Sequence, residues 1–427
     1  MSERMTLEET VLAIASFLAA PRFVTALTTA IVGTGVFAFA LRQMMGWGGL
    51  IATIATLVIL AAASIVARRS SIEWRGLLPI SLLVFLGWAT ISIFWSHYHW
   101  ATLGGLAYLG AFTILGLYAA LLRDTIQIVR AYGDVLRFTL AVSLAIEVLS
   151  GILIDTPIKF LLVLGKISEF GPIQGISGAR NQLGIVAVIA LITFATEYRT
   201  HLVSRTTSVF SLGGAALVLA LTRSPLAIGT LLLVGVGATA LCGLRRVRPD
   251  RQRSWQIALL AVTTVLGVVA WTSRSMIIAF FNVSGELTYR LNVWHTLWDL
   301  TALNPLQGWG WIGQWRDDIA PFPLFSTISA RENTSASNAF LDVWFQLGLV
   351  GIAIFAVMVA LTFVRSWLLA SRQRSIVFAW PALALIALVA SALAESSMLT
   401  EFGWLTFVAC CVKAAGELSW RTALRPE

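Results

Sequence analysis

The sequence predicts an all-α integral membrane protein with about twelve transmembrane helices and one long extracytoplasmic loop that contains short amphipathic helices. The first observation is composition: 58% of the residues are hydrophobic, 12% are charged, and the mean hydropathy is +0.84. These values are typical of polytopic membrane proteins. The second is a series of apolar runs that approach the roughly 20 residues needed to cross a bilayer. The third is an uneven distribution of basic residues between successive connections.

Twelve apolar runs follow one another along the chain, and we expect each to form a spanning helix. They cover 23–41, 49–67, 77–95, 101–122, 133–153, 181–197, 207–222, 225–243, 255–272, 346–364, 376–394 and 402–416. No repeat and no soluble domain is evident, so residues 1–427 are expected to form a single polytopic membrane domain. Between the ninth and tenth spans lies a loop, 272–345, that is too polar for lipid. A loop of this length without a function is uncommon, so it is the candidate functional surface.

The charge distribution predicts that both termini face the cytoplasm. In that orientation 20 of the 30 Lys and Arg residues lie on the cytoplasmic side, 9 lie outside, and Arg137 lies within the fifth span. Basic residues in short loops favour the cytoplasmic side, and the cluster from Arg245 to Arg253 assigns the connection between spans eight and nine to it. The formal charge of +9 therefore reflects topology and implies no nucleic-acid partner. The long loop then faces outside.

Three of the outer arginines, Arg180, Arg223 and Arg290, lie at breaks between apolar runs. An arginine near membrane depth is costly and normally has an anionic partner or a wet cavity. Its planar guanidinium suits phosphate oxygens. A single such arginine could simply extend to the lipid headgroups. Three on one face favour a shared anion.

The long loop is predicted to contain an amphipathic surface helix from Glu286 to Ala302. Its apolar stripe has helical spacing and consists of Leu287, Leu291, Trp294 and Trp298. His295 and Asp299 lie one turn apart on another face. Such a pair can be a general base with its orienting carboxylate, although it is more often only the solvated side of a helix.

The glycines of the loop, Gly308, Gly310 and Gly313, do not form a nucleotide-binding fingerprint, because no strand precedes them and the spacing is wrong. They predict a tight turn lined by aromatic rings, such as Trp309, that could stack on sugars.

Polar residues also mark the return of the loop to the membrane. Ser335 or Ser337 can cap a helix that starts near Asn338. Ser335, Asn338 and Asp342 are spaced three and four apart, which would place them on one helical stripe. Glu395, at the outer end of the eleventh span with Glu401 nearby, is another costly placement.

Three segments of the chain resemble the O-antigen ligase and Wzy-type polysaccharide polymerase superfamily of bacterial inner membranes. The first is G-A-R-N-Q-L-G, which opens a span. The second is Y-R-L-N-V-W-H-T-L-W-D-L-T-A-L-N-P-L-Q-G-W-G-W in the outer loop. The third is S-N-A-F-L-D-V-W-F-Q-L-G-L-V-G, which leads back into the membrane. Together they cover the half of the chain from about Gly171 onward.

The resemblance implies an enzyme of the bacterial inner (cytoplasmic) membrane that moves a glycan from undecaprenyl diphosphate to an acceptor hydroxyl outside, as a ligase or a polymerase. No metal, nucleotide sugar or cofactor is implied. The partners would be the lipid-linked glycan, a lipid or saccharide acceptor, and membrane lipids. By resemblance, Arg180, Arg223 and Arg290 match the arginines that bind the diphosphate. Acceptor or glycan binding is expected of four further residues: Ser337, Asn338, Trp294 and Trp309.

The chain departs from the family pattern at two places. Where many members have His-Lys-Asn it has Ala179-Arg180-Asn181, and where many have a histidine before the Asn of the third segment it has Ser337. A serine cannot act as a base unaided. However, expulsion of diphosphate through an oxocarbenium-like state, stabilised by arginines, leaves only a late deprotonation of the acceptor. The candidate bases are, in order of preference, Asp342, Glu395 and His295.

The alternative function is a transporter or flippase of lipid-linked or polyanionic substrates, which would hold a lipid phosphate with the same arginines. The sequence shows neither repeat symmetry nor the paired helices broken by Pro or Gly that are expected of a midplane binding site. A second alternative is a membrane scaffold, but a scaffold would not need three arginines at the membrane boundary.

Overall fold

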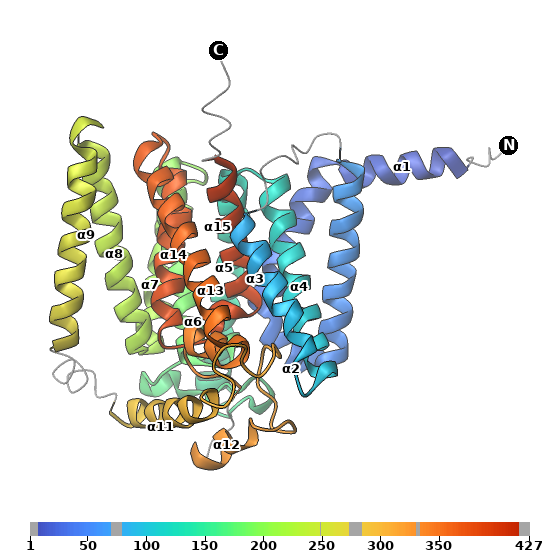
Figure 1. Cartoon of the computed structure of the whole chain (residues 1–427). Helices are drawn as coiled ribbons and strands as arrows, with labels where there is room; N and C mark the ends of the chain where they lie inside the picture. Colours follow the sequence, from blue (N-terminus) through green and yellow to red (C-terminus); the bar gives the residue numbers. More distant parts are fainter. Residues whose placement is uncertain (1–6, 70–78, 248, 273–283, 330–333, 418–427) are drawn as a thin grey trace.

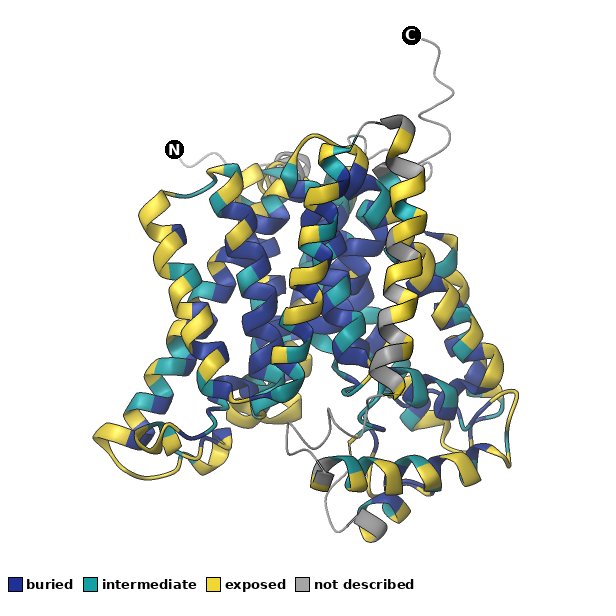
Figure 2. Cartoon of the chain, turned by 90° about the vertical axis from the view of Figure 1, so that its left-hand side faces the viewer, coloured by how far each residue is buried: buried dark blue, intermediate teal, exposed yellow. Residues whose placement is uncertain are grey.

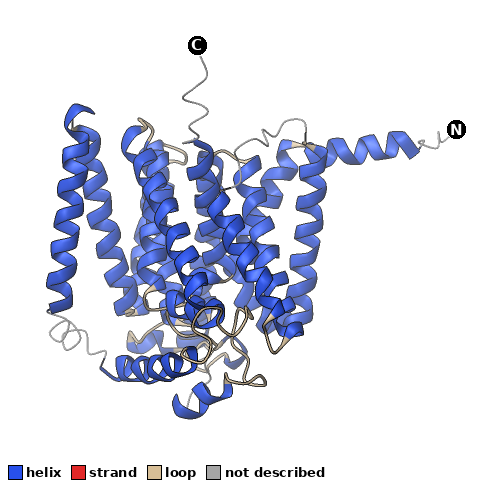
Figure 3. Ribbon diagram, in the orientation of Figure 1, coloured by secondary structure: helices blue, strands red, loops and turns tan. Residues whose placement is uncertain are grey.

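The computed structural model of the chain describes residues 7–69, 79–247, 249–272, 284–329 and 334–417. Within these ranges the elements are helices joined by turns and loops, and no strand is present (Figure 3). The α-helices are α1 (Leu7–Ala19), α2 (Pro21–Ala67), α3 (Ile80–Ile91), α4 (His99–Leu122), α5 (Thr125–Val148), α6 (Arg180–Thr200), α7 (Arg205–Thr222), α8 (Pro225–Arg246), α9 (Pro249–Thr272), α11 (Ser284–Thr301), α12 (Pro323–Ser329), α13 (Ala339–Arg372), α14 (Ala379–Ala392) and α15 (Glu401–Glu417).

Seven helices of the described part are long and apolar enough to cross a membrane. They are α2, α4, α5 with the π-helical turn that follows it, α6, α7, α8 and α13. Two shorter apolar helical segments, Ile80–Phe94 and Ile376–Ala392, overlap two more of the predicted runs. These findings confirm an all-α membrane protein, and the total of twelve spans stays a prediction.

Helix α2 contains two of the predicted runs because it turns back on itself. Gly46, between the runs, has φ 70° and ψ −179° inside an otherwise helical stretch of 47 residues. Only glycine adopts such a conformation without a steric penalty. Beyond the turn the chain returns to its start, since Ser64 Oγ donates to the carbonyl of Leu18 at 2.9 Å. Helix α2 is therefore a helical hairpin.

The helices form a bundle with two distinct ends. Helix α1 and the end of α15 lie at one end, whereas α11 and α12 lie at the other, with α11 running across the bundle (Figure 1). The first and last described helices thus share one end, and the loop helices occupy the opposite end. The predicted topology requires this arrangement; which end faces the cytoplasm stays a prediction from the charges.

The outward faces of the bundle are apolar. Figure 2 shows buried residues concentrated inside the bundle and exposed residues along the outward faces of its helices. Large hydrophobic side chains are among the most exposed: Ile80 is 77% exposed and Phe210 76%. A soluble protein rarely exposes such extensive apolar surface. The lipid bilayer is therefore the solvent for these faces.

Polar side chains inside the bundle are hydrogen-bonded between helices. Trp380 Nε1 donates to Thr193 Oγ1 at 3.0 Å, joining α14 to α6. Trp404 Nε1 donates to Thr113 Oγ1 at 2.8 Å, joining α15 to α4. Because an unpaired polar group in hydrocarbon is costly, these bonds select the neighbours of each helix.

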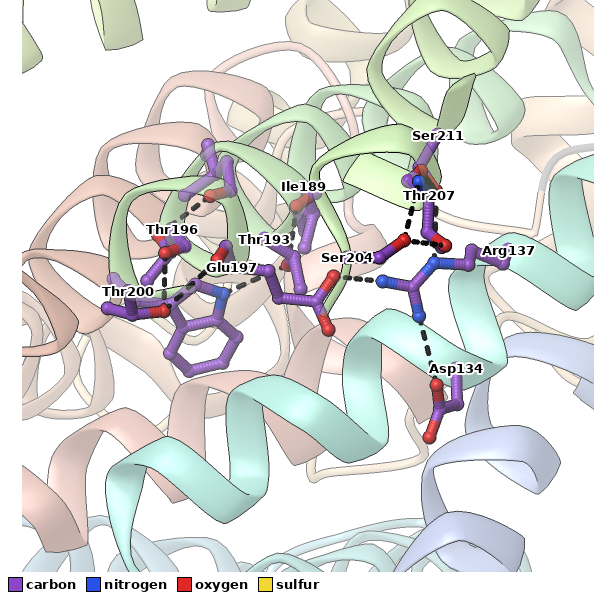
Figure 4. Close-up of polar contacts among 12 residues, drawn as sticks. Asp134, Arg137, Ile189, Thr193, Thr196, Glu197, Thr200, Ser204, Thr207 and Ser211 are labelled. Carbon is purple, nitrogen blue, oxygen red and sulfur yellow. Dashed lines mark hydrogen bonds and ion pairs between the residues drawn. The ribbon is translucent and has the colours of Figure 1, made fainter. Parts of the chain in front are cut away.

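Arg137, which the sequence places within a span, forms a buried ion pair with Glu197. Figure 4 shows Glu197 of α6 and Asp134 of α5 directed at the guanidinium, whose Nε donates to Ser211 Oγ of α7 at 3.0 Å. The Glu197 side chain is fully buried. A Cβ at Gly133 would clash with its carboxylate, so glycine on α5 makes room for it. Three helices thus meet at one charge pair.

Candidate functional site

A cavity of about 460 Å³ is built largely from segments at the end of the bundle that carries α11 and α12. Its walls come from α2, the segment before α6, the start of α6, the connection from α11 to α13, the start of α13, and the segment from α14 to α15. The polar side chains that line it include Arg42, Gln43, Gln182, Gln314, Ser335, Asp342, Glu395, Ser397, Thr400 and Glu401. A concave site with several convergent polar groups is the usual form of a ligand site.

Glu395 joins segments that are far apart in the sequence. Its Oε1 accepts a hydrogen bond from Asn181 Nδ2 at 2.8 Å and lies 3.4 Å from Arg290 Nη2. Asn181 Oδ1 in turn accepts a hydrogen bond from Ser224 Oγ at 2.7 Å. Arg290 also donates through Nη1 to the carbonyl of Ala394. The start of α6, the start of α8, helix α11 and the end of α14 therefore meet at one carboxylate.

One of the three predicted arginines belongs to this network, and the other two are chain neighbours of network residues. Arg290 is part of it and is 15% exposed. Arg180 directly precedes Asn181, and Arg223 directly precedes Ser224, so the chain neighbours of both belong to the same network. Within the described part of the chain, the guanidinium groups of Arg180 and Arg223 have no hydrogen-bond or ion-pair partner. None of the three arginines lines the cavity, and Arg290 reaches it only through Glu395. Arg180 and Arg223 remain available to an anion that approaches the network.

Asp342 is buried at the cavity wall and bonded to the loop. It is 2% exposed. Its Oδ1 accepts from Trp315 Nε1 at 2.8 Å and from Gln346 Nε2 at 2.9 Å, and its Oδ2 accepts from the N–H of Ala336 at 3.4 Å. Gln346 continues the connection, because its Oε1 accepts from the N–H of Gly313 at 2.9 Å. Asp342 therefore holds the loop against α13.

The start of α13 differs in detail from the prediction. Asn338, and neither Ser335 nor Ser337, caps the helix: its Oδ1 accepts from two N–H groups of the first turn. A capping residue needs an extended backbone, which Asn338 has, whereas Ser337 is left-handed with φ 49°. Asn338 Nδ2 also donates to the carbonyl of Leu393 at 2.9 Å. Asn338 therefore ties α13 to the end of α14, next to Glu395.

The two tryptophans predicted to bind glycan are bonded within the loop. Trp294 Nε1 donates to the carbonyl of Ala336 at 2.9 Å, and Trp309 Nε1 donates to that of Leu300 at 3.2 Å. Both rings are half-buried against a second hydrophobic cluster that contains Trp315. Neither ring lines the cavity.

The glycine segment forms a tight turn that packs on a break in α13. Gly308, Gly310 and Gly313 all have positive φ. Helix α13 is interrupted at Gly348, which has φ 68° and ψ −168°, and the N–H of Gly310 donates to the carbonyl of Gln346 at 2.8 Å. The loop thus satisfies a carbonyl that the break releases from the helix. Broken helices, which the sequence did not reveal, are therefore present at Gly46 and Gly348.

Helix α11 begins and ends close to the predicted positions but buries another face. Val293 and Leu297 are buried, at 2% and 0% exposure. Leu291 and Trp298, from the predicted stripe, are 50% and 64% exposed. Both faces of α11 carry apolar residues, so the apolar pattern alone does not distinguish the face that packs on the loop from the exposed face.

His295 lies on the outer side of α11. Its Nδ1 is 3.3 Å from Asp299 Oδ2, as the one-turn spacing predicts, and the two side chains are 83% and 67% exposed. His295 does not line the cavity. The pair therefore lies on a solvated face.

The cavity is also lined by Arg42 and Glu401, which sequence reasoning did not assign to the site. Arg42 donates through Nη1 to Gln314 Oε1 at 3.1 Å, and its guanidinium lies 4.9 Å from the ring centre of Trp47. Tyr108 donates its hydroxyl to Glu401 Oε1 at 2.9 Å. The one available signal was that Arg42 is an outer arginine next to an apolar run.

Comparison with known families gives one match. Residues 208–356 match the Wzy_C family model, described as O-antigen ligase. The matched range contains Arg223, Arg290 and Asp342, and it ends before Glu395. No curated protein matches the chain. The match confirms the resemblance drawn from the sequence: over residues 208–356 the chain is similar to the O-antigen ligase family.

Proposed function

We propose that the chain is a membrane glycosyltransferase that moves a glycan from undecaprenyl diphosphate to an acceptor hydroxyl on the extracytoplasmic face, as an O-antigen ligase or an exopolysaccharide polymerase. The family match over residues 208–356 supports a ligase or polymerase activity. The observation that carries the proposal is Arg290, a largely buried arginine held by the cavity-lining Glu395. A guanidinium paired with a carboxylate of a polar cavity in a membrane protein suits a phosphate ligand.

In this proposal Arg290, Arg180 and Arg223 bind the diphosphate of the donor. Arg290 is oriented by Glu395 and by the carbonyl of Ala394. As the bond from the anomeric carbon to phosphate oxygen breaks, negative charge builds on the diphosphate, and preorganised cations stabilise it. This chemistry calls for no metal ion and no nucleotide sugar.

The acceptor would approach from the α13 side of the cavity. Ser337 and Asn338 lie beside the cavity residue Ser335 and are proposed to contact it, while Trp294 and Trp309 hold the loop that forms this wall. Of the three bases predicted from the sequence, Asp342 and Glu395 line the cavity and His295 does not.

The test uses the purified full-length protein with an undecaprenyl diphosphate-linked glycan and, in separate reactions, a lipid and a saccharide acceptor. We expect glycan on one acceptor and release of undecaprenyl diphosphate in equal amounts. Glycan on the lipid acceptor would identify a ligase, and chain extension would identify a polymerase. If the donor stays intact with every acceptor, the proposed function is wrong.

The transporter alternative gains one observation, the broken helices α2 and α13. Transporters use such breaks to present backbone groups to a substrate. Near the break in α13, however, the Gln346 carbonyl is bonded to the N–H of Gly310, so it is not offered to a ligand. Reconstitution in vesicles separates the two functions, because a flippase would move labelled donor between leaflets without cleaving it.

A further inference from the structure

A second polar cluster, formed by Arg42, Tyr108 and Glu401, lies at the cavity. Glu401 begins α15 and follows the turn that contains Ser397 and Thr400, whereas Tyr108 comes from α4 and Arg42 from the α2 hairpin. Glu401 has φ 45°, an unusual backbone conformation for a residue with a side chain. Such conformations concentrate at functional sites. Arg42 and Glu401 of this cluster line the cavity, as Glu395 does, but the cluster and Glu395 come from different sets of helices.

The carboxylates that line the cavity differ in how many donors they already accept. Asp342 accepts three hydrogen bonds from Trp315, Gln346 and Ala336. Glu395 accepts from Asn181 and is paired with Arg290.

Glu401 accepts a single hydrogen bond, from Tyr108, and no arginine lies within ion-pair distance of it in the described part of the chain. A carboxylate that already accepts several donors, or that is paired with a guanidinium, has less affinity for a proton. Among the carboxylates that line the cavity, Glu401 is therefore the one best placed to accept a proton.

We propose that Glu401 is the catalytic base that accepts the proton of the acceptor hydroxyl, with Tyr108 holding its Oε1 so that Oε2 faces the cavity. The inference rests on the proposed glycosyl transfer. In the reaction the acceptor oxygen forms a bond to the anomeric carbon, and its proton passes to Glu401. The bond from that carbon to the phosphate oxygen breaks, and the diphosphate leaves with the electron pair. Glu401 then releases the proton to water.

The assignment divides the cavity into two functional parts. Arg290, held by the cavity-lining Glu395, would act on the leaving diphosphate, whereas Glu401 would act on the acceptor. Arg42 donates to Gln314 and lies over Trp47, and it gives the acceptor part a cation without neutralising Glu401 directly. A base and a diphosphate-binding arginine need to be on different sides of the reacting carbon, because the acceptor and the leaving group are on different sides.

The test compares Glu401→Gln with the parent and with Glu169→Gln, a control that changes an exposed glutamate outside the cavity lining. Loss of a general base lowers the rate by about 100-fold or more. We expect this loss of transfer to hydroxyl acceptors in Glu401→Gln, none in Glu169→Gln, and unchanged donor binding in both. Azide, which has no proton to lose, should restore donor consumption in Glu401→Gln and give a glycosyl azide.

Two results would overturn the assignment: transfer to hydroxyl acceptors within about twofold of the control, or a loss of transfer that azide does not restore. If Glu401→Gln does not fold, Glu401→Ala replaces it, because it also removes the carboxylate and leaves space for azide. The same outcomes then apply to Glu401→Ala. The parent enzyme separates this inference from the proposed function. If the parent transfers no glycan, the proposed function itself has failed.

Discussion

The ion pair between Arg290 and Glu395 has two roles in the proposed function: it holds segments of the cavity wall together, and it orients the arginine proposed to bind the diphosphate. The guanidinium is 15% exposed, and its partner is also bonded to Asn181. An unpaired arginine at this depth would be costly, whereas an arginine bound too tightly would not be available to a phosphate. The separation of 3.4 Å between Nη2 and Oε1 is long for a hydrogen bond, so this contact holds the guanidinium less firmly than a shorter one would.

Removing the guanidinium should weaken donor binding. We expect Arg290→Ala to lower affinity for the lipid diphosphate by about 10- to 100-fold, because hydrogen bonds to charged groups contribute about 1.5–3 kcal/mol. Arg290→Lys should recover only part of it, since lysine lacks the planar fork. Arg316→Ala, at an exposed arginine that pairs with Asp318, is the control and should bind donor like the parent. Equal donor affinity of Arg290→Ala and the control would show that Arg290 does not bind the donor.

At Asp342 we expect a substitution to lower the stability of the protein and to leave its turnover nearly unchanged. In Asp342→Asn the new amide N–H group would face Trp315 or Gln346, both of which are donors to Asp342. An unsatisfied buried donor costs about 1–3 kcal/mol, so the thermal unfolding midpoint should fall. Turnover per folded molecule should stay within about threefold. The control is Asp155→Asn at an exposed position. A normal melting temperature combined with lost turnover would instead make Asp342 a catalytic residue.

At the scale of elements, the site depends on two interruptions of helices and on the loop that packs against one of them. The glycine turn approaches α13 so closely that a Cβ on Gly308 would lie 2.5 Å from the N atom of Gly348. The backbone N–H of Gly310 and the side chain of Gln346 complete this contact. The loop is therefore held by backbone contacts as well as by its aromatic cluster.

Gly308→Ala should destabilise the protein by at least about 2 kcal/mol, since a left-handed residue with a Cβ costs about 1–2 kcal/mol before the contact with Gly348 is counted. Gly229→Ala is the matched control: Gly229 lies inside α8 with nothing within 4 Å of the added methyl group. It should be neutral or stabilising by about 0.5–1 kcal/mol. Thermal unfolding in detergent measures the stability of both variants. Equal midpoints would show that the loop shifts away from α13 to accommodate the added methyl group.

For the whole molecule, the described termini lie at one end of the bundle and the loop helices at the other (Figure 1). The charge asymmetry of the sequence predicts that the first end faces the cytoplasm. In that orientation the cavity would lie in the outer half, where a lipid-linked glycan would be presented.

Cysteine labelling in intact cells checks this orientation. In a Cys242→Ala background we expect a cysteine at the exposed position Asp317 to react with an impermeant reagent added outside, and one at the exposed position Arg251 to react only after lysis. The other two native cysteines are buried. Outside labelling at Arg251 would reverse the orientation and move the cavity to the cytoplasmic side.

Much of the fold could be predicted from the sequence, because each helix that contacts lipid must be apolar over most of its length. Residues of the candidate site could be proposed from the sequence only where a polar residue interrupts an apolar run, as Arg290 and Glu395 do, and the structure pairs these two residues. Contacts between distant segments left no local signal: Tyr108 and Glu401 are separated by 293 positions. Capping by Asn338 depended on the backbone of Ser337, which residue type does not reveal.

The pair of Arg137 and Glu197 has a consequence for how the chain enters the membrane during synthesis. Translocon insertion scales assign about 2.5–3.5 kcal/mol to an arginine at the centre of a span. Asp134 pairs with Arg137 within α5 but is 56% exposed, whereas the fully buried partner, Glu197, is present only once α6 has been made. We therefore expect α5 to be retained at the insertion machinery until α6 has been made. In a reporter assay α5 should insert poorly by itself and better with α6, and Glu197→Gln should abolish the gain. Efficient insertion of α5 alone would show that the two helices enter lipid independently.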